Sequence, residues 1–317
     1  MKVTEHLAQA KGMLFSIEIL PPLKGKSIQS IYEGIDPLLE YKPSFIDVTY
    51  HREEYVYKHR ENGLLEKLSI RKRPGTVGIC AAIMNKYKID AVPHIICGGF
   101  TKEETENALI DLSFLGIDNV LTIRGDAIKS EPGFTAEPEG NNYAIDLVHQ
   151  VVRMNHGKFM DEELLDASPT DFCIGVAGYP EKHFEAPNAR SDLKYLKQKV
   201  DAGADYIVTQ MFFDNKKYFG FVQQCREAGI TVPIIPGLKV LTTKKQLSIL
   251  PKTFHIEVPG ELQDAVDKCK TDKEVKEAGI EWCVSQSVEL KKSGVPCLHF
   301  YTMGTSDAVR RVASMVF

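Results

Sequence analysis

The sequence of 317 residues lacks the features of membrane proteins, disulfide-rich secreted proteins and zinc proteins. No apolar run approaches the roughly 20 residues of a transmembrane helix, and the first apolar stretch is too short for a signal peptide and contains Glu18. The seven cysteines are scattered, odd in number and without a CxxC pair. We therefore expect small core cysteines in a reducing cytoplasm, with neither disulfides nor a metal site.

A strong excess of one charge is also missing. The net charge is −4, with 26% charged and 43% hydrophobic residues, as in ordinary soluble globular proteins. The small basic cluster Lys67, Arg71, Lys72 and Arg73 is interpreted as a solvated surface segment. We expect no nucleic-acid or membrane partner. Because no linker, repeat or composition shift interrupts the chain, we also expect a single domain over residues 1–317.

Short apolar segments alternate with helical patterns along most of the chain. Eight segments are predicted as strands: 14–22, 45–50, 91–97, 119–124, 172–177, 206–211, 232–236 and 297–302. Helices are predicted at 28–41, 78–87, 101–115, 143–154, 188–202, 216–228, 244–250, 261–268, 273–292 and 308–316. This alternation favours an α/β fold, a (β/α)8 TIM barrel. A doubly wound open sheet is the alternative, but no GxGxxG follows a strand.

Two segments are predicted to lack regular strands. Residues 51–75 are highly charged, and we expect a loop insertion with a short helix there. Residues 125–142 form a long loop rich in Gly, Pro and Glu, and loops of that length are commonly functional or disordered.

Glu18 is the unusual residue of the first strand. The strand is otherwise apolar and ends at Pro21 and Pro22, which predicts burial on both faces. A carboxylate there is costly unless it is neutral, paired or used in chemistry. From the strand alone, two interpretations stay open: a carboxylate in a polar crevice or paired with a buried cation, and a general acid with a raised pKa.

Polar side chains gather where the predicted strands end, which is where a TIM barrel carries its chemistry. They are Glu18, Asp47, Thr49, Tyr50, His51, His94, Arg124, Gly125, Asp126, Tyr179, Glu181, His183, Gln210, His299, Tyr301 and Thr302. Water or a ligand must satisfy so many polar groups. Arg124 beside Gly125 suits a phosphate or an electron-rich ring. There is no GxSxG and no cysteine beside a histidine, and we predict no metal site.

Several sequence blocks together resemble one family. In order, they are FSIEILPP, FIDVTYH, PHIIC, LTIRGD, NNYAIDLV, VAGYPEKHFEA, SDLKYLKQKVDAGADYIVTQMFFD, IIPG and LHFYT. From about residue 13 to 304 the chain resembles methylenetetrahydrofolate reductase. The resemblance implies a cytoplasmic flavoprotein in which NADH or NADPH reduces bound FAD. The flavin then reduces 5,10-methylenetetrahydrofolate to 5-methyltetrahydrofolate in a ping-pong reaction. It further implies a short bacterial-type enzyme without a regulatory domain, and leaves a homo-oligomer open.

The resemblance also assigns roles to residues. Glu18 matches the general acid, Asp126 an aspartate that tunes the flavin and contacts the pterin, and Gln210 a glutamine that binds folate and nicotinamide. FAD-contacting positions are matched by Thr49, Tyr50, His94, Arg124, Gly125, Asp126, Tyr143, Ala144, Asp146, Tyr179, His183, Asp192 and Lys199.

The chain departs from the family pattern at three places. Lys244 stands where bacterial relatives carry an aromatic residue, and Met303-Gly304-Thr305 replaces Leu-Asn-Arg near the folate. His51-Arg52 replaces a glycine-rich turn. These changes affect the expected contacts to the substrate tail and the nicotinamide.

Three other functions are compatible with a polar barrel mouth. Another FAD-dependent barrel oxidoreductase, such as a proline dehydrogenase-like enzyme, is disfavoured by Glu18 and Gln210. A flavin-free aldolase or lyase would need a Schiff-base lysine, and no lysine lies inside a predicted strand. A non-catalytic binding role would leave the polar strand ends without a purpose.

Overall fold

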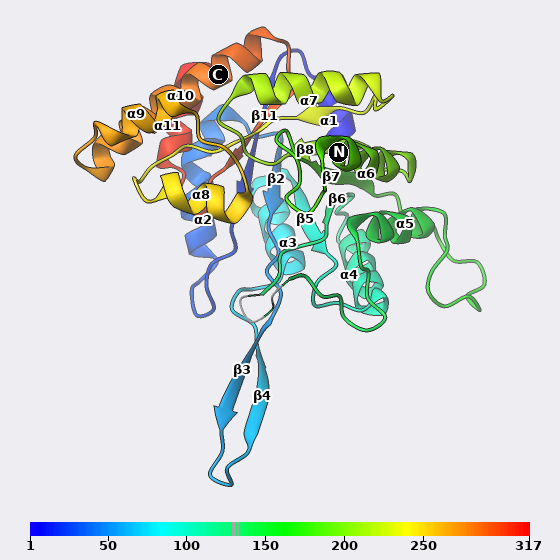
Figure 1. The fold of residues 1–317 in the computed structure, drawn as a ribbon. Coiled ribbons are helices and arrows are strands. Elements are labelled where there is room, and N and C mark those ends of the chain that lie inside the picture. Colours follow the sequence, from blue (N-terminus) through cyan, green and yellow to red (C-terminus); the bar gives the residue numbers. More distant parts are fainter. Residues whose placement is uncertain (129–130, 132) are drawn as a thin grey trace.

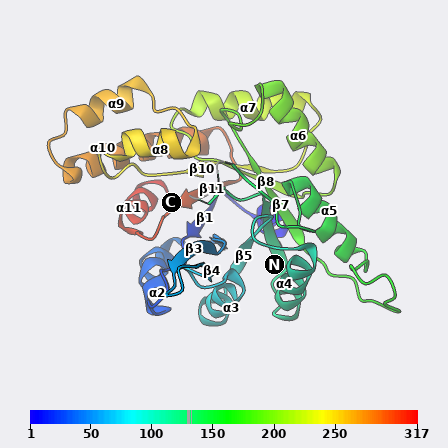
Figure 2. The ribbon, with the colours of Figure 1, turned by 60° about the horizontal axis from the view of Figure 1, so that its bottom comes forward.

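The computed structural model describes residues 1–128, 131 and 133–317. Its centre is a ring of parallel strands surrounded by helices, which confirms the predicted barrel (Figure 1 and Figure 2). Around the ring the strands are β1 (Leu14–Ile19), β2 (Phe45–Val48), β5 (Asp90–Ile96), β6 (Asn119–Ile123), β7 (Cys173–Gly178), β8 (Tyr206–Thr209), β9 (Ile234–Ile235), β10 (Gly237–Leu238) and β11 (Cys297–Tyr301).

The ring closes through β9 and β10, which flank Pro236. β9 pairs with β8, β10 pairs with β11, and β11 pairs with β1 from Leu14↔Cys297 to Glu18↔Tyr301. Proline lacks the N–H that a ladder requires, so the strand is interrupted there, but the Pro236 carbonyl still accepts from the His299 amide at 3.1 Å. The seventh predicted strand thus extends past Pro236 to Leu238.

Most helices lie outside the ring. They are α2 (Gln29–Ile35) with the 3₁₀ helix η1 (Asp36–Tyr41), α3 (Thr76–Tyr87), α4 (Lys102–Phe114), α5 (Ala144–Asn155), α6 (Ala189–Asp201), α7 (Asn215–Glu227), α8 (Gln246–Phe254), α9 (Gly260–Asp267), α10 (Asp272–Lys292) and α11 (Asp307–Val316). Pro37 lies in the first turn of η1, so the predicted helix 28–41 is split. Thr101 and Glu104 form the predicted capping box of α4.

An additional helix, α1 (Val3–Gln9), was not predicted. It lies against the barrel end opposite the β3–β4 arm described below (Figure 1). The amide of Val3 donates to Asn119 Oδ1 at 2.8 Å, and the Val3 side chain is fully buried in the barrel-interior cluster.

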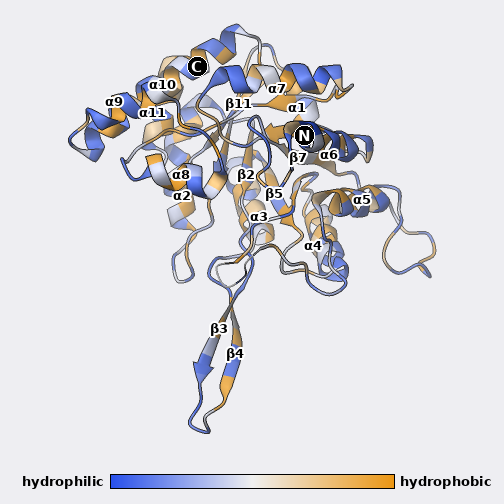
Figure 3. Cartoon of the chain, in the orientation of Figure 1, coloured by the Kyte–Doolittle hydropathy of each residue, from blue (hydrophilic) through white to orange (hydrophobic). Residues whose placement is uncertain are grey.

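The described residues form three buried apolar clusters. One fills the barrel and includes Phe45, Val92 and Tyr206, and the largest lies between the strands and the helices. The third joins Met211 and Phe213 to buried residues of α8, α9 and α10. Hydrophobic residues dominate β5, whereas α6 is mostly hydrophilic (Figure 3). Six of the seven cysteines are buried and all are free, as expected for core residues. Within the described ranges, no helix combines the length and the apolar character needed to cross a membrane.

The prediction of a loop with a short helix at 51–75 is wrong. This segment forms an antiparallel hairpin of β3 (Glu54–His59) and β4 (Leu65–Ile70) that projects from the body as an arm (Figure 1). Its strands read EYVYKH and LEKLSI, which lack a strict alternation of apolar and polar residues, so the sequence did not indicate strands there. The turn contains Gly63 at φ +77°, and the Arg60 amide donates to the Leu64 carbonyl at 2.9 Å.

The predicted loop 125–142 lies partly outside the described residues. In its described part, Gly140 forms an isolated bridge with Thr101, at the start of α4. Arg52, at the base of the β3–β4 arm, forms an ion pair with Glu131. The loop and the arm are therefore in contact at the mouth of the barrel.

Gly279 in α10 packs directly against the backbone of the loop at Leu241. A Cβ atom there would lie 1.8 Å from the Leu241 carbonyl oxygen, whereas a Cβ at Gly220 in α7 would meet nothing within 4 Å. We expect Gly279→Ala to lower the free energy of unfolding by about 1–3 kcal/mol through overpacking. Gly220→Ala should raise it by about 0.5–1 kcal/mol. Urea unfolding of both variants checks this, and equal effects at the two positions would contradict it.

Candidate active site

Four inward-facing residues lie in one row across the mouth of the barrel. Glu18 on β1 is in register with Tyr301 on β11 and with Asp47 on β2. Leu238 on β10 pairs with Phe300, so the next residue, Lys239, comes beside Tyr301. Parallel strands in register place paired side chains on the same face. The row is therefore Lys239, Tyr301, Glu18, Asp47.

Glu18 lies in the middle of this row with its side chain 16% exposed. The backbone carbonyl oxygen of Glu18 accepts a hydrogen bond from Thr302 Oγ1 at 2.7 Å, which fixes the end of β1 against β11. Burial, helped by the charge of Asp47, raises the pKa of Glu18 to about 7, although His94 and Lys239 act in the opposite direction. Glu18 can therefore hold a proton near neutral pH.

Asp47 and His94 form a buried pair beside Glu18. His94 Nε2 lies 3.4 Å from Asp47 Oδ2 and 3.6 Å from Glu18 Oε2. Burial lowers the pKa of His94, but the hydrogen bond to Asp47 and the charge of Glu18 outweigh burial, so the pKa is raised. The histidine is therefore held between two carboxyl groups and can share a proton with either.

Thr49 and Tyr50 follow β2. The Thr49 hydroxyl is buried and has no hydrogen-bond partner among the described residues, as expected for a group that faces a ligand. Tyr50 packs against Phe100, with 5.1 Å between the ring centroids.

Arg124, Gly125 and Asp126 follow β6. Arg124 donates to Glu185 Oε2 at 2.5 Å, and its guanidinium lies 4.8 Å from the centroid of the Phe134 ring. Gly125 has φ +83°, and a Cβ atom there would lie 3.3 Å from Ile96. Asp126 is exposed and interacts electrostatically with Tyr179. The geometry thus leaves a close backbone approach at Gly125 beside a guanidinium.

A second polar cluster lies between the end of β7 and α6. The rings of Tyr179 and His183 meet edge to face at 4.7 Å, and the His183 amide donates to Asp192 Oδ2 at 2.9 Å. Lys199 Nζ donates to the Ala177 carbonyl at 2.8 Å. Burial lowers the pKa of Lys199 to about 8, although Asp192 opposes this. Arg124, His183 and Lys199 together make this side of the mouth suitable for an anion.

The remaining predicted residues lie at the start of α5 and the end of β8. Asp146 Oδ2 accepts from the Tyr143 amide at 3.0 Å, so it caps α5, and Tyr143 is 62% exposed. Ala144 is the first residue of α5. Gln210 Oε1 accepts from the Met211 amide at 2.9 Å. The electrostatic influence of Asp146 on Cys97 places the start of α5 near the end of β5.

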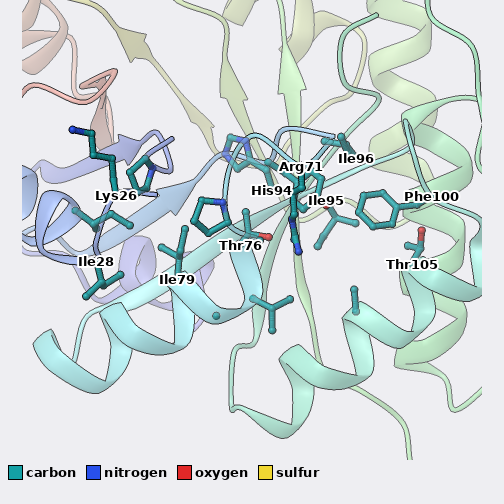
Figure 4. Close-up of a pocket in the computed structure, with 18 residues that line it drawn as sticks. Lys26, Ile28, Arg71, Thr76, Ile79, His94, Ile95, Ile96, Phe100 and Thr105 are labelled. Carbon is teal, nitrogen blue, oxygen red and sulfur yellow. The ribbon is translucent and has the colours of Figure 1, made fainter. Parts of the chain in front are cut away.

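An apolar cavity of about 530 Å³ opens beside His94. Figure 4 shows Arg71 beside His94, with Ile79 of α3 to one side and Phe100 and Thr105 of α4 to the other. Its position beside the site gives a ring-shaped ligand room next to the polar row.

Lys239 is the residue that the sequence analysis missed. The seventh strand was predicted to end at Pro236, so Lys239 was placed outside it, but Lys239 directly follows β10 and is 6% exposed. The sequence analysis found no lysine inside a predicted strand, and Lys239 lies just beyond the end of β10. The signal was the run IIPGLKVL, in which Lys239 is the single polar residue.

The departures from the family pattern have local consequences. Lys244 Nζ pairs with Asp267 at 3.0 Å on the surface, and Met303 and Gly304 both have positive φ.

In the described part of the chain, no cluster of three or more His, Cys, Asp or Glu is arranged to hold a metal ion.

Comparisons with known proteins agree on one family. The family described as methylenetetrahydrofolate reductase matches residues 2–316. The chain is 32% identical to methylenetetrahydrofolate reductase 1 of Schizosaccharomyces pombe, covering 98% of this chain but 48% of that protein. It is 30% identical to 5,10-methylenetetrahydrofolate reductase of Escherichia coli, covering 96% of this chain and 91% of that protein.

A further relative, the probable methylenetetrahydrofolate reductase (NADPH) of Caenorhabditis elegans, is 29% identical, with 97% of this chain and 43% of that protein covered. The chain thus spans about half the length of these eukaryotic relatives.

A solved structure supports the fold. A protein from Clostridium thermocellum, described as binding two copies of 5-methyl-5,6,7,8-tetrahydrofolic acid, superposes with a TM-score of 0.62 at 14% identity, covering 99% of this chain and 97% of that chain. The fold, the polar row at the barrel mouth and the match over residues 2–316 lead to one conclusion: the chain belongs to the methylenetetrahydrofolate reductase family.

Proposed function

We propose that this chain reduces 5,10-methylenetetrahydrofolate to 5-methyltetrahydrofolate with NADH or NADPH, through bound FAD. The main support for the proposal is Glu18, a carboxyl group that can hold a proton near neutral pH, at the mouth of a barrel that belongs to this family. Folate reduction of this kind needs an acid as well as a hydride. Glu18 can act as that acid because burial raises its pKa towards neutral pH.

The residues around the mouth fit a dinucleotide cofactor. Arg124, His183 and Lys199 provide positive or hydrogen-bonding groups for phosphates, and Thr49 carries a buried hydroxyl without a partner. Gly125 permits close backbone approach. When bound, FAD supplies hydride transfer between the nicotinamide and the folate.

The chain's own part in the reaction is to position the folate and to move a proton. Glu18 protonates a folate nitrogen, which opens the five-membered ring to an iminium that accepts hydride. Asp47 and His94 lie behind Glu18 and can return a proton to it, because His94 Nε2 is 3.6 Å from Glu18 Oε2. Asp126 after β6 and Gln210 after β8, on either side of β7, are the proposed contacts to the pterin.

The cofactor proposal is tested by the colour of the protein. We expect the purified chain to show flavin absorbance, and Arg124→Ala to weaken FAD binding. Loss of a charge-assisted contact of about 1.5–3 kcal/mol corresponds to a 10- to 100-fold higher Kd. Arg310→Ala, on the distant helix α11, is the control and should not change the Kd. A colourless protein that fails to bind added FAD would defeat the proposal.

Glu18 should also make stability depend on pH. Its pKa is raised from 4.5 to about 7 in the folded state, so the unfolded chain loses this proton first as pH rises. The wild type therefore loses stability between about pH 4.5 and 7, by on the order of 2–3 kcal/mol, and Glu18→Gln should escape this loss.

Urea unfolding from pH 5 to 8 measures the difference between the two proteins. Glu33→Gln, on the exposed face of α2, is the control and should follow the wild type. Parallel pH curves for wild type and Glu18→Gln would show that Glu18 is ionised throughout this range.

The acid role itself is tested by separating the two half-reactions. Glu18→Gln keeps the shape of the side chain but cannot deliver a proton. We expect flavin reduction by NADH or NADPH within about tenfold of wild type, and folate reduction slower by about 10²–10⁴-fold, as is typical of lost general acid catalysis. Stopped-flow traces of each half-reaction measure both rates. An equal fall in both would assign Glu18 a structural or binding role.

A further inference from the structure

Lys239 is a buried cation that the proposed reaction does not yet use. It is 6% exposed, and its Nζ donates to the Tyr301 carbonyl at 3.2 Å. No carboxylate of the described residues forms an ion pair with it. Burying an ammonium group without a direct counter-ion is costly, and such a lysine is expected to have a function.

The direction of the Lys239 side chain follows from its neighbours. Leu238 and Val240 both belong to the cluster between the strands and the helices, so the residue between them faces the barrel interior. Gly237 leaves room on the same inward face, where a Cβ atom would lie 2.5 Å from the Tyr301 hydroxyl. Lys239 and Tyr301 thus share one wall of the mouth.

Glu18 stands midway between two basic side chains. In the strand order β10, β11, β1, β2, β5, Lys239 follows the strand two places to one side of β1, and His94 lies on the strand two places to the other side. His94 contacts the Glu18 carboxyl group directly at 3.6 Å, whereas Lys239 acts through its charge.

We propose that Lys239 is a positioning residue for the proton: its ammonium group, on the opposite side of Glu18 from His94, sets the pH range over which Glu18 remains a competent acid. This inference rests on the proposed function, because it concerns the acid of that reaction. Lys239 lies outside the motifs that carry the family resemblance, two residues after IIPG and well before LHFYT.

The charged groups around Glu18 and Lys239 support the proposed role of Lys239. Glu18 faces His94 from β5, Asp47 from β2 and Lys239, and Lys239 faces Glu18 and the Cys283 thiol from α10. Burial lowers the pKa of Lys239 to about 8, while Cys283 and Glu18 favour its charged form. A positive charge near Glu18 stabilises the carboxylate, so Lys239 makes Glu18 release its proton at a lower pH than burial alone would dictate.

The test compares Lys239→Met, which removes the charge, with Lys239→Arg, which keeps it. Two quantities are followed against pH: the rate at which reduced enzyme passes hydride to 5,10-methylenetetrahydrofolate, and the infrared carbonyl band of the protonated Glu18 carboxyl without folate. The Glu18 band is identified by its absence in Glu18→Gln. Lys252→Met, on the exposed side of α8, serves as the matched control.

We expect both pH midpoints of Lys239→Met to move up by about 1 pH unit, the size of a charge interaction across two strand spacings, roughly 10 Å, at an effective dielectric constant of about 20. Lys239→Arg and Lys252→Met should stay close to wild type. A uniform loss of rate, or a higher KM, with unmoved midpoints would overturn the proposal.

The infrared measurement separates this inference from the proposed function. If the wild type fails to reduce 5,10-methylenetetrahydrofolate, the proposed function fails, but the Glu18 band still shows whether Lys239 controls its proton. If folate is reduced and the band midpoint is the same in wild type and Lys239→Met, only the inference about Lys239 fails.

Discussion

The site depends on one electrostatic constraint: a carboxyl group is buried in a barrel wall without an ion-pair partner strong enough to keep it ionised. Burial is the largest influence on the pKa of Glu18, and the cationic groups around it only moderate that effect. A shorter distance to a cation would ionise the group, and a drier pocket would keep it protonated above neutral pH. In this barrel the pKa of Glu18 is intermediate, because the register between strands determines which polar groups lie beside it.

The mouth of the barrel divides into two regions with different electrostatics. From β10 to β5, the carboxyl groups of Glu18 and Asp47 lie between two basic groups within hydrogen-bonding or Coulombic reach, which suits proton transfer. From β6 to α6, Arg124, His183 and Lys199 gather with few buried carboxylates, which suits phosphates. A long ligand can therefore lie with its anionic part over one region and its reactive ring over the other.

Much of this arrangement could be predicted from the sequence because it depends on local patterns. Apolar segments bounded by Gly and Pro located the barrel strands, and Glu18 was conspicuous within one of them. The β3–β4 arm was missed because its charged strands lack a clear two-residue period, and Lys239 because Pro236 suggested the end of a strand that continues to Leu238. The Asp47–His94 pair and its distance to Glu18 depend on the register between strands, which no single segment encodes.

The pairing of the first and last barrel strands has a consequence for biosynthesis. Glu18 is synthesised well before the wall beside it, because that wall is β11, whose register partner Tyr301 lies 283 positions later in the chain. Contacts so distant in sequence form late and slow folding, and parallel strands left unpaired are prone to aggregate. During translation, the edge of β1 that pairs with β11 stays unpaired until residue 297 has left the ribosome. The acid of the site thus acquires its surroundings only after the distant strand β11 has been synthesised.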